Sequence, residues 1–227
     1  MWSKFSILLI VFLFLAGCCA PQKRNWEDSF LLVRVTSAAI ACPIGEDSCK
    51  LSSEGFVGSG WSIASDGETS IIATAGHVCV PNAVLRTIIV FDNAGKTYDS
   101  TVIKIDEKLD TCLLKIRGNI PPLVISLVSP KVREHYVAMS APHGMWSPGI
   151  VPVFEGLFCG KDKSAACFTM FSTQGSSGGP ILDRNGEVVG MVLAVPKDFN
   201  AITVSCTYEA LVNLSETAYL SLSEKKK

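Results

Sequence analysis

The feature that most restricts the fold of this chain is a succession of short, β-branched apolar runs. About eleven such runs are separated by Gly, Pro, Asn and Asp, a spacing typical of sandwiches and barrels and unlike that of helix-rich folds. With 227 residues, 48% of them hydrophobic, the chain can bury a real core and is not a disordered one. The expected strands lie near 30–40, 56–64, 70–75, 84–92, 97–106, 112–117, 135–140, 149–154, 166–171, 187–195 and 201–207.

The segments between these runs indicate how they are connected. Asp92–Gly95 and Asp183–Gly186 have the composition of hairpin turns. Residues 121–131, which contain three prolines, interrupt the pattern midway and are expected to connect two barrels. Residues 208–222 are compatible with a short closing helix, and 223–227 form a charged, solvated tail.

The N-terminus has the pattern of an export signal. A positive start at Lys4 is followed by an apolar run to Ala16, which is too short to span a bilayer as a helix. The run ends in Leu15-Ala-Gly-Cys18, which resembles the bacterial lipobox, in which the cysteine is lipidated after cleavage. We therefore expect a lipoprotein signal peptide over 1–17, a lipid anchor on Cys18 and a tether over 18–28. Ordinary cleavage near Ala20 and an uncleaved anchor are the alternatives.

Charge and cysteine content restrict the partners. The formal net charge is −1, so no basic field is available to hold nucleic acid. Export favours disulfides, and Cys42 with Cys49 and Cys159 with Cys167 each bracket a short polar loop and are the expected local bridges. A zinc site is the competing interpretation of these cysteines. Because no C-x-x-C pair is present, we expect neither a metal nor another cofactor.

The segment most informative about chemistry is Gln174-Gly-Ser-Ser-Gly-Gly-Pro180. Glycines on both sides of Ser177 allow a tight turn in which the hydroxyl is exposed and amide N–H groups converge, as a nucleophilic serine requires. The segment also matches the G-x-S-x-G elbow of α/β-hydrolases. In that class the histidine follows the serine, whereas His77, His135 and His143 all precede it. The order histidine, aspartate, serine remains.

Five motifs in this order resemble those of trypsin-like (chymotrypsin-fold) serine proteases, most closely the bacterial high-temperature-requirement branch. They cover roughly residues 30–220 and are Gly58-Ser-Gly-Trp-Ser-Ile63, Ile72-Ala-Thr-Ala-Gly-His77-Val78, Asp106-Glu-Lys-Leu-Asp110-Thr-Cys-Leu-Leu-Lys115, Ala138-Met-Ser-Ala-Pro-His-Gly144 and Gly175-Ser-Ser-Gly-Gly-Pro180. The resemblance implies an all-β, chymotrypsin-like double barrel over 29–222 and a serine endopeptidase that acts on protein or peptide substrates at the bacterial cell envelope.

The resemblance also implies residue roles. His77 would be the general base, Asp110 would orient it, and Ser177 would be the nucleophile. The backbone amides of Gly175 and Ser177 would form the oxyanion hole. Asp106 is an alternative to Asp110 because both flank the same strand. The competing function is a catalytically silent binding module with the same fold.

Two further expectations follow from the family pattern. Phe171, Leu193 and Val195 would line the primary specificity pocket, and their apolar side chains favour a small or apolar substrate residue. Ser176 occupies the position at which digestive relatives carry an aspartate that pairs with a new N-terminus. The oxyanion hole is therefore expected to be ordered without such cleavage. Only 50 residues follow Ser177, so no C-terminal peptide-binding domain is expected.

Overall fold

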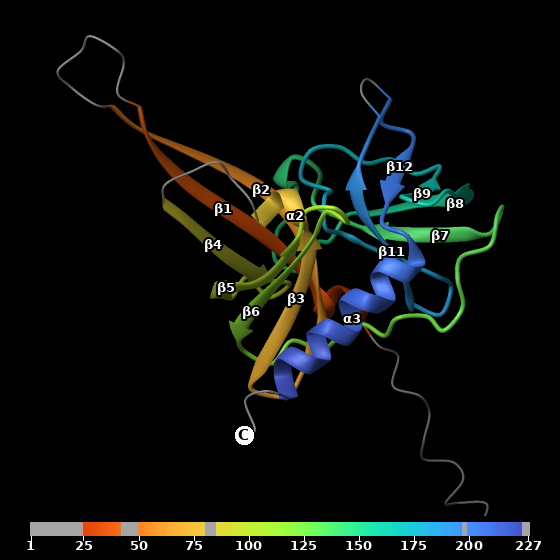
Figure 1. Cartoon of the computed structure of the whole chain (residues 1–227), viewed down its shortest axis with the longest axis horizontal. Helices are drawn as coiled ribbons and strands as arrows, with labels where there is room; N and C mark the ends of the chain where they lie inside the picture. The colour runs from red at the N-terminus through yellow and green to blue at the C-terminus, as the bar shows by residue number, and fades with distance from the viewer. Residues whose placement is uncertain (1–24, 42–49, 80–84, 197–198, 224–227) are drawn as a thin grey trace, which may run out of the picture.

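The computed structural model describes residues 25–41, 50–79, 85–196 and 199–223, and within them twelve strands form two closed six-stranded barrels (Figure 1). The first barrel contains β1 (Phe30–Ala41), β2 (Lys50–Ser65), β3 (Thr69–Ala75), β4 (Leu85–Asp92), β5 (Thr97–Asp106) and β6 (Thr111–Arg117). The second contains β7 (His135–Met139), β8 (Val153–Lys161), β9 (Ala166–Phe168), β10 (Pro180–Leu182), β11 (Val188–Ala194) and β12 (Thr203–Ser205). The expected double barrel is confirmed.

The helical elements are short except the last. They are η1 (Trp26–Ser29), α2 (Gly76–Cys79), η2 (Pro142–Gly144) and α3 (Tyr208–Ser223). The expected closing helix is thus present.

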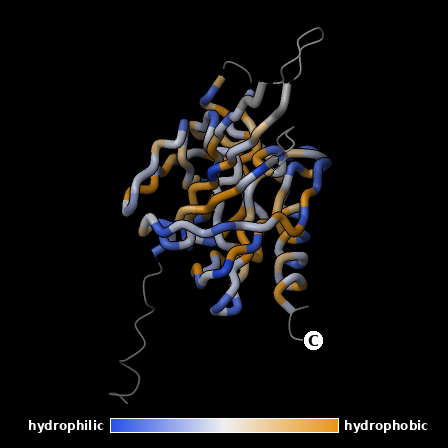
Figure 2. Tube along the Cα trace, turned by 90° about the vertical axis from the view of Figure 1, so that its left-hand side faces the viewer, coloured by the Kyte–Doolittle hydropathy of each residue, from blue (hydrophilic) through white to orange (hydrophobic). Residues whose placement is uncertain are grey.

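The core of the first barrel is built from strands that are buried on both faces. All seven residues of β3 are buried, and β3 lies between β2 and β6. In Figure 2 the hydrophobic segments run through the body of the molecule, while hydrophilic ones gather at turns. A strand buried on both faces need not alternate between apolar and polar residues. Strand β3 accordingly holds the apolar run 71–73 together with the buried polar residues Thr69, Ser70 and Thr74.

Helix α3 joins the two barrels. Its buried residues recur at helical spacing and belong to the same apolar core as the first barrel. The helix contacts β2, β3 and β6 of that barrel and β11 of the second, and Figure 1 shows it lying across the front of the molecule. At its start the Tyr208 hydroxyl donates a 2.7 Å hydrogen bond to the Ser126 carbonyl. The buried members are Ala210, Leu211, Leu214, Ala218 and Leu222.

The segment between β6 and β7 connects the barrels, as its prolines indicated. Its backbone is tied first to the one barrel and then to the other. The Leu123 amide donates to the Ser62 carbonyl at 2.9 Å, and the Ser126 amide donates to the Val188 carbonyl at 2.9 Å. The prediction for residues 121–131 is therefore confirmed. The two expected hairpins also form, because the Gly95 amide donates to Asp92 at 2.8 Å and the Gly186 amide to Asp183 at 3.0 Å.

The second barrel departs from the expected strands at β8. The strand expected over 149–154 begins only at Val153 and continues to Lys161. Pro152 lacks an amide hydrogen and cannot extend the strand on its N-terminal side. Gly156 and Gly160 weaken the strand pattern in the C-terminal part of β8, which the sequence did not predict. Glycine is required at position 156, because a Cβ atom on Gly156 would collide with the Thr169 carbonyl. Strand β10 is short and was not expected.

The N-terminal expectations fall largely outside the described residues. The signal peptide, Cys18 and most of the tether lie there, as do Cys42 and Cys49. Trp26 is partly buried against the core, and its ring lies where a Cβ atom on Gly186 would be. Trp26, which falls within the expected tether, thus packs against the body of the domain. Among the described helices, none has both the length and the apolar character that crossing a membrane requires.

Candidate active site

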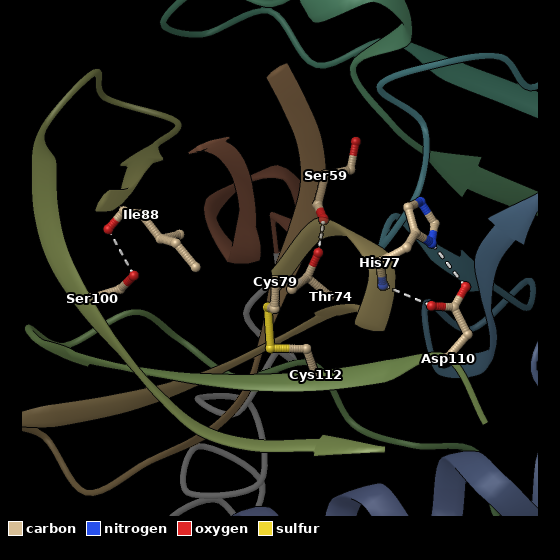
Figure 3. Close-up of a disulfide and its surroundings, with 8 residues drawn as sticks. All are labelled: Ser59, Thr74, His77, Cys79, Ile88, Ser100, Asp110 and Cys112. Carbon is tan, nitrogen blue, oxygen red and sulfur yellow. Dashed lines mark hydrogen bonds and ion pairs between the residues drawn. A yellow bond between two sulfur atoms is a disulfide. The ribbon is translucent and has the colours of Figure 1, made fainter. Parts of the chain in front are cut away.

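His77 and Asp110 are brought into contact at one end of the first barrel. His77 lies in α2 directly after β3, and Asp110 lies directly before β6, which pairs with β3. The His77 Nδ1 and Asp110 Oδ2 atoms are 2.8 Å apart, and the His77 backbone amide donates to Oδ1 at 2.7 Å (Figure 3). An ionised carboxylate only accepts, so Nδ1 carries the hydrogen and Nε2 is left as the accepting nitrogen.

The backbone around this pair is closely packed. Asp110 has a φ of 49°, in the left-handed region, and its carbonyl accepts a 2.8 Å hydrogen bond from the Gly76 amide. A Cβ atom on Gly76 would lie 2.9 Å from atoms of Asp110 and Thr111, closer than real Cβ atoms come. Glycine at position 76 therefore allows the turn that carries His77 to approach Asp110.

Asp106 serves a different purpose from Asp110. Its Oδ1 accepts hydrogen bonds from the Lys108 amide at 3.1 Å and the Leu109 amide at 3.0 Å. Asp106 thus closes the turn between β5 and β6, while Asp110 is the carboxylate that contacts His77.

Ser177 lies in a tight loop that packs closely against the first barrel. Gly175 and Gly178 have φ values of +91° and +90°, which only glycine adopts readily. A Cβ atom on Gly178 would collide with the Ser59 carbonyl and the Thr74 hydroxyl. The Ser177 carbonyl in turn accepts a 2.8 Å hydrogen bond from the Ser59 amide. The loop is therefore fixed beside the end of β3, from which α2 and His77 follow.

The Ser177 hydroxyl points to the second barrel. It donates to the Leu193 carbonyl at 3.3 Å, and within the described ranges no hydrogen bond joins it to His77. Serine hydroxyls change rotamer easily, and contacts of this kind tighten when substrate binds. The structure thus records the Ser177 hydroxyl bonded to the Leu193 carbonyl rather than to the imidazole.

The amides of Gly175 and Ser177 are the groups expected to form the oxyanion hole, and Gly175 is a buried residue. Neither donates a hydrogen bond to an acceptor in the part of the chain that the structure describes. The Gln174 carbonyl accepts a 2.6 Å hydrogen bond from the His143 amide. Because a trans peptide directs its C=O and N–H to opposite sides, this bond directs the Gly175 N–H away from His143.

A disulfide that the sequence did not predict supports the site. Cys79 and Cys112 are bonded, and both are fully buried (Figure 3). The strand register explains the pairing, because Cys112 is the β6 partner of Thr74 in β3, five residues before Cys79. A cysteine two residues after the motif histidine and another two after the motif aspartate was the only signal available.

The expected bond between Cys159 and Cys167 is absent, and both are free thiols. The pairing of β8 with β9 explains this, since Cys167 stands opposite Gly160 and the register shifts across Cys159. The Cys159 thiol turns toward the Leu157 carbonyl at 3.8 Å. Cys206 is a third free cysteine and is buried.

The three residues expected to line a specificity pocket are placed differently. Leu193 is nearly buried, and its carbonyl contacts the Ser177 hydroxyl. Val195 is half-buried just beyond β11. Phe171 is 43% exposed, and its ring packs against that of Phe154 with centroids 5.4 Å apart. All three side chains are apolar, but Leu193 is nearly buried and Phe171 is not enclosed.

A cleft of about 380 Å³ adjoins the serine loop. Its walls come from β1 and β2 of the first barrel and from the second barrel's His143 and Gln174. A smaller cleft of about 250 Å³ lies at His77 and Asp110. His77 and Asp110 therefore border one cleft, and Gln174 of the serine loop borders the other.

The curated proteins to which this chain is similar include several that are named as proteases. The chain is 33% identical over 146 residues to "Serine protease HTRA1" of Xenopus laevis, which covers 59% of this chain and 30% of that protein. It is 31% identical over 153 residues to "Magnetosome formation protease MamE" of Paramagnetospirillum magneticum, covering 61% of this chain and 20% of that protein. The chain thus matches less than a third of the length of these relatives.

Solved structures share the fold. The active form of the Rv3671c protease from M. tuberculosis superposes with a TM-score of 0.63 at 21% identity, covering 82% of this chain and 79% of that one. The serine endoprotease from Yersinia pestis gives a TM-score of 0.65 at 19% identity, covering 88% and 68%.

A family match covers the motifs described above. The model of the trypsin-like peptidase domain matches residues 58–191, which contain His77, Asp110 and Ser177. Because this match spans more than half of the 227 residues, the chain belongs to the family of trypsin-like peptidase domains.

Proposed function

We propose that this protein is a serine endopeptidase in which Ser177 is the nucleophile, His77 the general base and Asp110 the residue that orients His77. The observation that carries the proposal is the contact of both Asp110 carboxylate oxygens with His77, one with the ring and one with the backbone amide. This arrangement fixes the tautomer that leaves Nε2 able to accept a proton. An imidazole held in this way at the same end of the fold as a half-buried serine is suited to acyl transfer.

The reaction begins with a rotation of the Ser177 side chain. The hydroxyl leaves the Leu193 carbonyl and donates to His77 Nε2, which removes the proton as Oγ attacks the substrate carbonyl. The amides of Gly175 and Ser177 donate to the oxyanion that forms. His77 then passes the proton to the leaving amine, and a water molecule hydrolyses the acyl-enzyme by the same steps in reverse order.

Apolar groups around the serine support a preference for small or apolar residues before the cleaved bond. Leu193, Val195 and Phe171 supply this surface, and no acidic group among them would attract a Lys or Arg side chain. The proteases to which the chain is similar support protein or peptide substrates.

We also propose that the protein acts at the bacterial cell envelope, held there by a lipid on Cys18. The supporting features are the apolar run that ends in Leu15-Ala-Gly-Cys18 and the similarity to a probable periplasmic serine endoprotease, DegP-like, of Chlamydia pneumoniae, which is 27% identical over 155 residues. Multiple acyl chains on one cysteine would keep the domain at the membrane.

Proteolysis of an unfolded protein tests the enzymatic proposal. The full chain is expected to fragment reduced, unfolded β-casein with new termini that follow small or apolar residues, whereas Ser177→Ala is expected to leave it intact. Equal fragmentation by both proteins would mean that a contaminating protease is responsible. Binding of casein without cleavage by either would favour the silent binding module.

A further inference from the structure

The buried hydroxyl of Ser59 joins strand β2 of the first barrel to two loops of the second. Ser59 Oγ donates a 2.8 Å hydrogen bond to the Gly175 carbonyl, and it accepts one of 2.9 Å from the Ala141 amide. The residue is fully buried. Residues 59 and 175 are 116 positions apart in the chain, so this contact exists only when both barrels are folded together.

The backbone of Ser59 is part of the same connection. Its amide donates to the Ser177 carbonyl at 2.8 Å, and its carbonyl accepts a 2.8 Å hydrogen bond from the Thr74 hydroxyl (Figure 3). Thr74 lies at the end of β3, three residues before His77. One residue therefore links the serine loop, through Thr74, to the strand that positions the imidazole.

The two peptide groups that flank Gly175 are both held in place. The Gln174 carbonyl is held by the His143 amide at 2.6 Å, and the Gly175 carbonyl is held by Ser59 Oγ. Gly175, with a φ of +91°, has the conformational freedom for a peptide flip. A flip of the Gln174–Gly175 peptide would turn the Gly175 N–H out of the oxyanion hole. The His143 amide opposes this flip directly, and the Ser59 hydroxyl opposes it indirectly, because it fixes the next peptide and so restrains the Gly175 backbone about which the first peptide would turn.

The rest of the loop contains no charged group that could do this instead. Ser176 is fully buried, and its hydroxyl accepts a 3.3 Å hydrogen bond from the Thr173 amide. The loop is thus ordered by neutral hydrogen bonds, and the two that Ser59 donates to it come from the other barrel.

We propose that Ser59 is a positioning residue that keeps the Gly175 amide directed into the oxyanion hole, so that the site is ordered without cleavage of the N-terminus. This inference rests on the proposed peptidase function. Without the Ser59 hydroxyl, the buried Gly175 carbonyl and Ala141 amide lose their partner. This favours conformations in which the Gly175–Ser176 peptide turns to another partner, and the Gly175 backbone that carries the N–H is then no longer restrained.

Ser59→Ala is tested beside a matched control, Ser62→Ala. Ser62 lies on the same strand and is equally buried, but its hydroxyl donates to the Ile120 carbonyl at 3.0 Å in the connection between the barrels. Ser62→Ala loses one buried hydrogen bond, and Ser59→Ala loses two, to Gly175 and from Ala141. Only Ser59→Ala loses a contact with the serine loop.

Peptide hydrolysis by the full-length proteins gives the first measurement. Ser59→Ala is expected to lower kcat by about 10- to 100-fold with KM within about twofold, below the ~10²- to 10³-fold loss for deleting an oxyanion donor itself. A peptidyl trifluoromethyl ketone, which forms an oxyanion on the enzyme, should lose affinity in parallel. Ser62→Ala should keep both values near those of the wild type. Equal kcat in the two variants would overturn the proposal.

Hydrogen exchange gives a second measurement that does not require activity. Exchange in a peptide covering residues 173–179 is expected to be at least tenfold faster in Ser59→Ala than in Ser62→Ala, under conditions in which both proteins remain folded. Equal exchange in this segment would contradict the positioning role. If the wild type failed to hydrolyse any peptide but the exchange difference appeared, the peptidase proposal would fail and the role of Ser59 in ordering the loop would stand.

Discussion

Cys79 and Cys112 are joined by a disulfide, and each lies two residues after a residue of the candidate site. Cys79 follows His77, and Cys112 follows Asp110. The bond and the His77–Asp110 contact span the same sequence separation of 33 residues. The disulfide therefore anchors the single turn of α2, which contains His77, to the start of β6.

Removing this disulfide should lower stability and activity together. For Cys79→Ala with Cys112→Ala, the chain-entropy relation gives a loss of about 4 kcal/mol for a loop of this length. Urea unfolding of the oxidised proteins measures it. Cys206→Ala, which removes a buried thiol without removing a crosslink, is the control. A double variant as stable as that control would show that the bond does not constrain the fold.

The two aspartates near His77 should respond very differently to replacement. Asp110→Asn is expected to reduce kcat by about 10⁴-fold, because the amide would favour the wrong imidazole tautomer while the fold persists. Asp106→Asn only weakens the hydrogen bonds that the side chain accepts from the Lys108 and Leu109 amides in the β5–β6 turn. It should change kcat by less than about threefold. Steady-state hydrolysis of one peptide by both variants decides the matter, and a larger defect in Asp106→Asn would reverse the assignment.

Ser177→Ala and His77→Ala should behave as a unit. Each alone is expected to remove nearly all peptidase activity, and the double variant should be little worse than either, because nucleophile and base act in one step. Rates that multiplied in the double variant would indicate that the two residues act independently.

The free cysteines should differ in reactivity. Burial, followed by its hydrogen bond with Cys159, raises the pKa of Cys167 to about 11, and burial raises the pKa of Cys206 to about 11. Few thiolates form at either site at pH 8, so iodoacetamide should label the exposed Cys159 first in the folded protein. Peptide mapping without reduction would detect a Cys159–Cys167 bond, whose presence would contradict the free thiols of the structure.

The lipid anchor is tested by a pair of neighbouring substitutions. Cys18→Ser should abolish incorporation of a labelled fatty acid in a bacterial host, because the serine hydroxyl is not the acceptor of the lipidating reaction. Cys19→Ser should leave incorporation intact. Label retained in Cys18→Ser would rule out the proposed anchor.

The sequence predicted the fold because its strands and turns carry strong local signals. Asp92–Gly95 and Asp183–Gly186 form the expected hairpins. The order of the motifs indicated that His77 and Asp110 act together, and the structure places them in contact. Strand β8 was misplaced because its glycines hide the pattern and a proline delays its start.

The cysteine pairing and the role of Ser59 could not be predicted. The Cys79–Cys112 bond depends on the register of β3 with β6, and Cys159 is turned by a shift in the β8–β9 ladder. Ser59 contacts residues more than 80 positions away, which no local pattern encodes.

The measurement that tests the central claim most directly is reaction of the full chain with a fluorophosphonate, followed by mapping of the modified residue. Attack requires an activated serine and an oxyanion hole, but no knowledge of the natural substrate. We predict a single adduct on Ser177 in the wild-type protein, none in Ser177→Ala and a strongly slowed reaction in His77→Ala. Absence of an adduct on folded wild-type protein, or an adduct that persists in Ser177→Ala, would contradict the account.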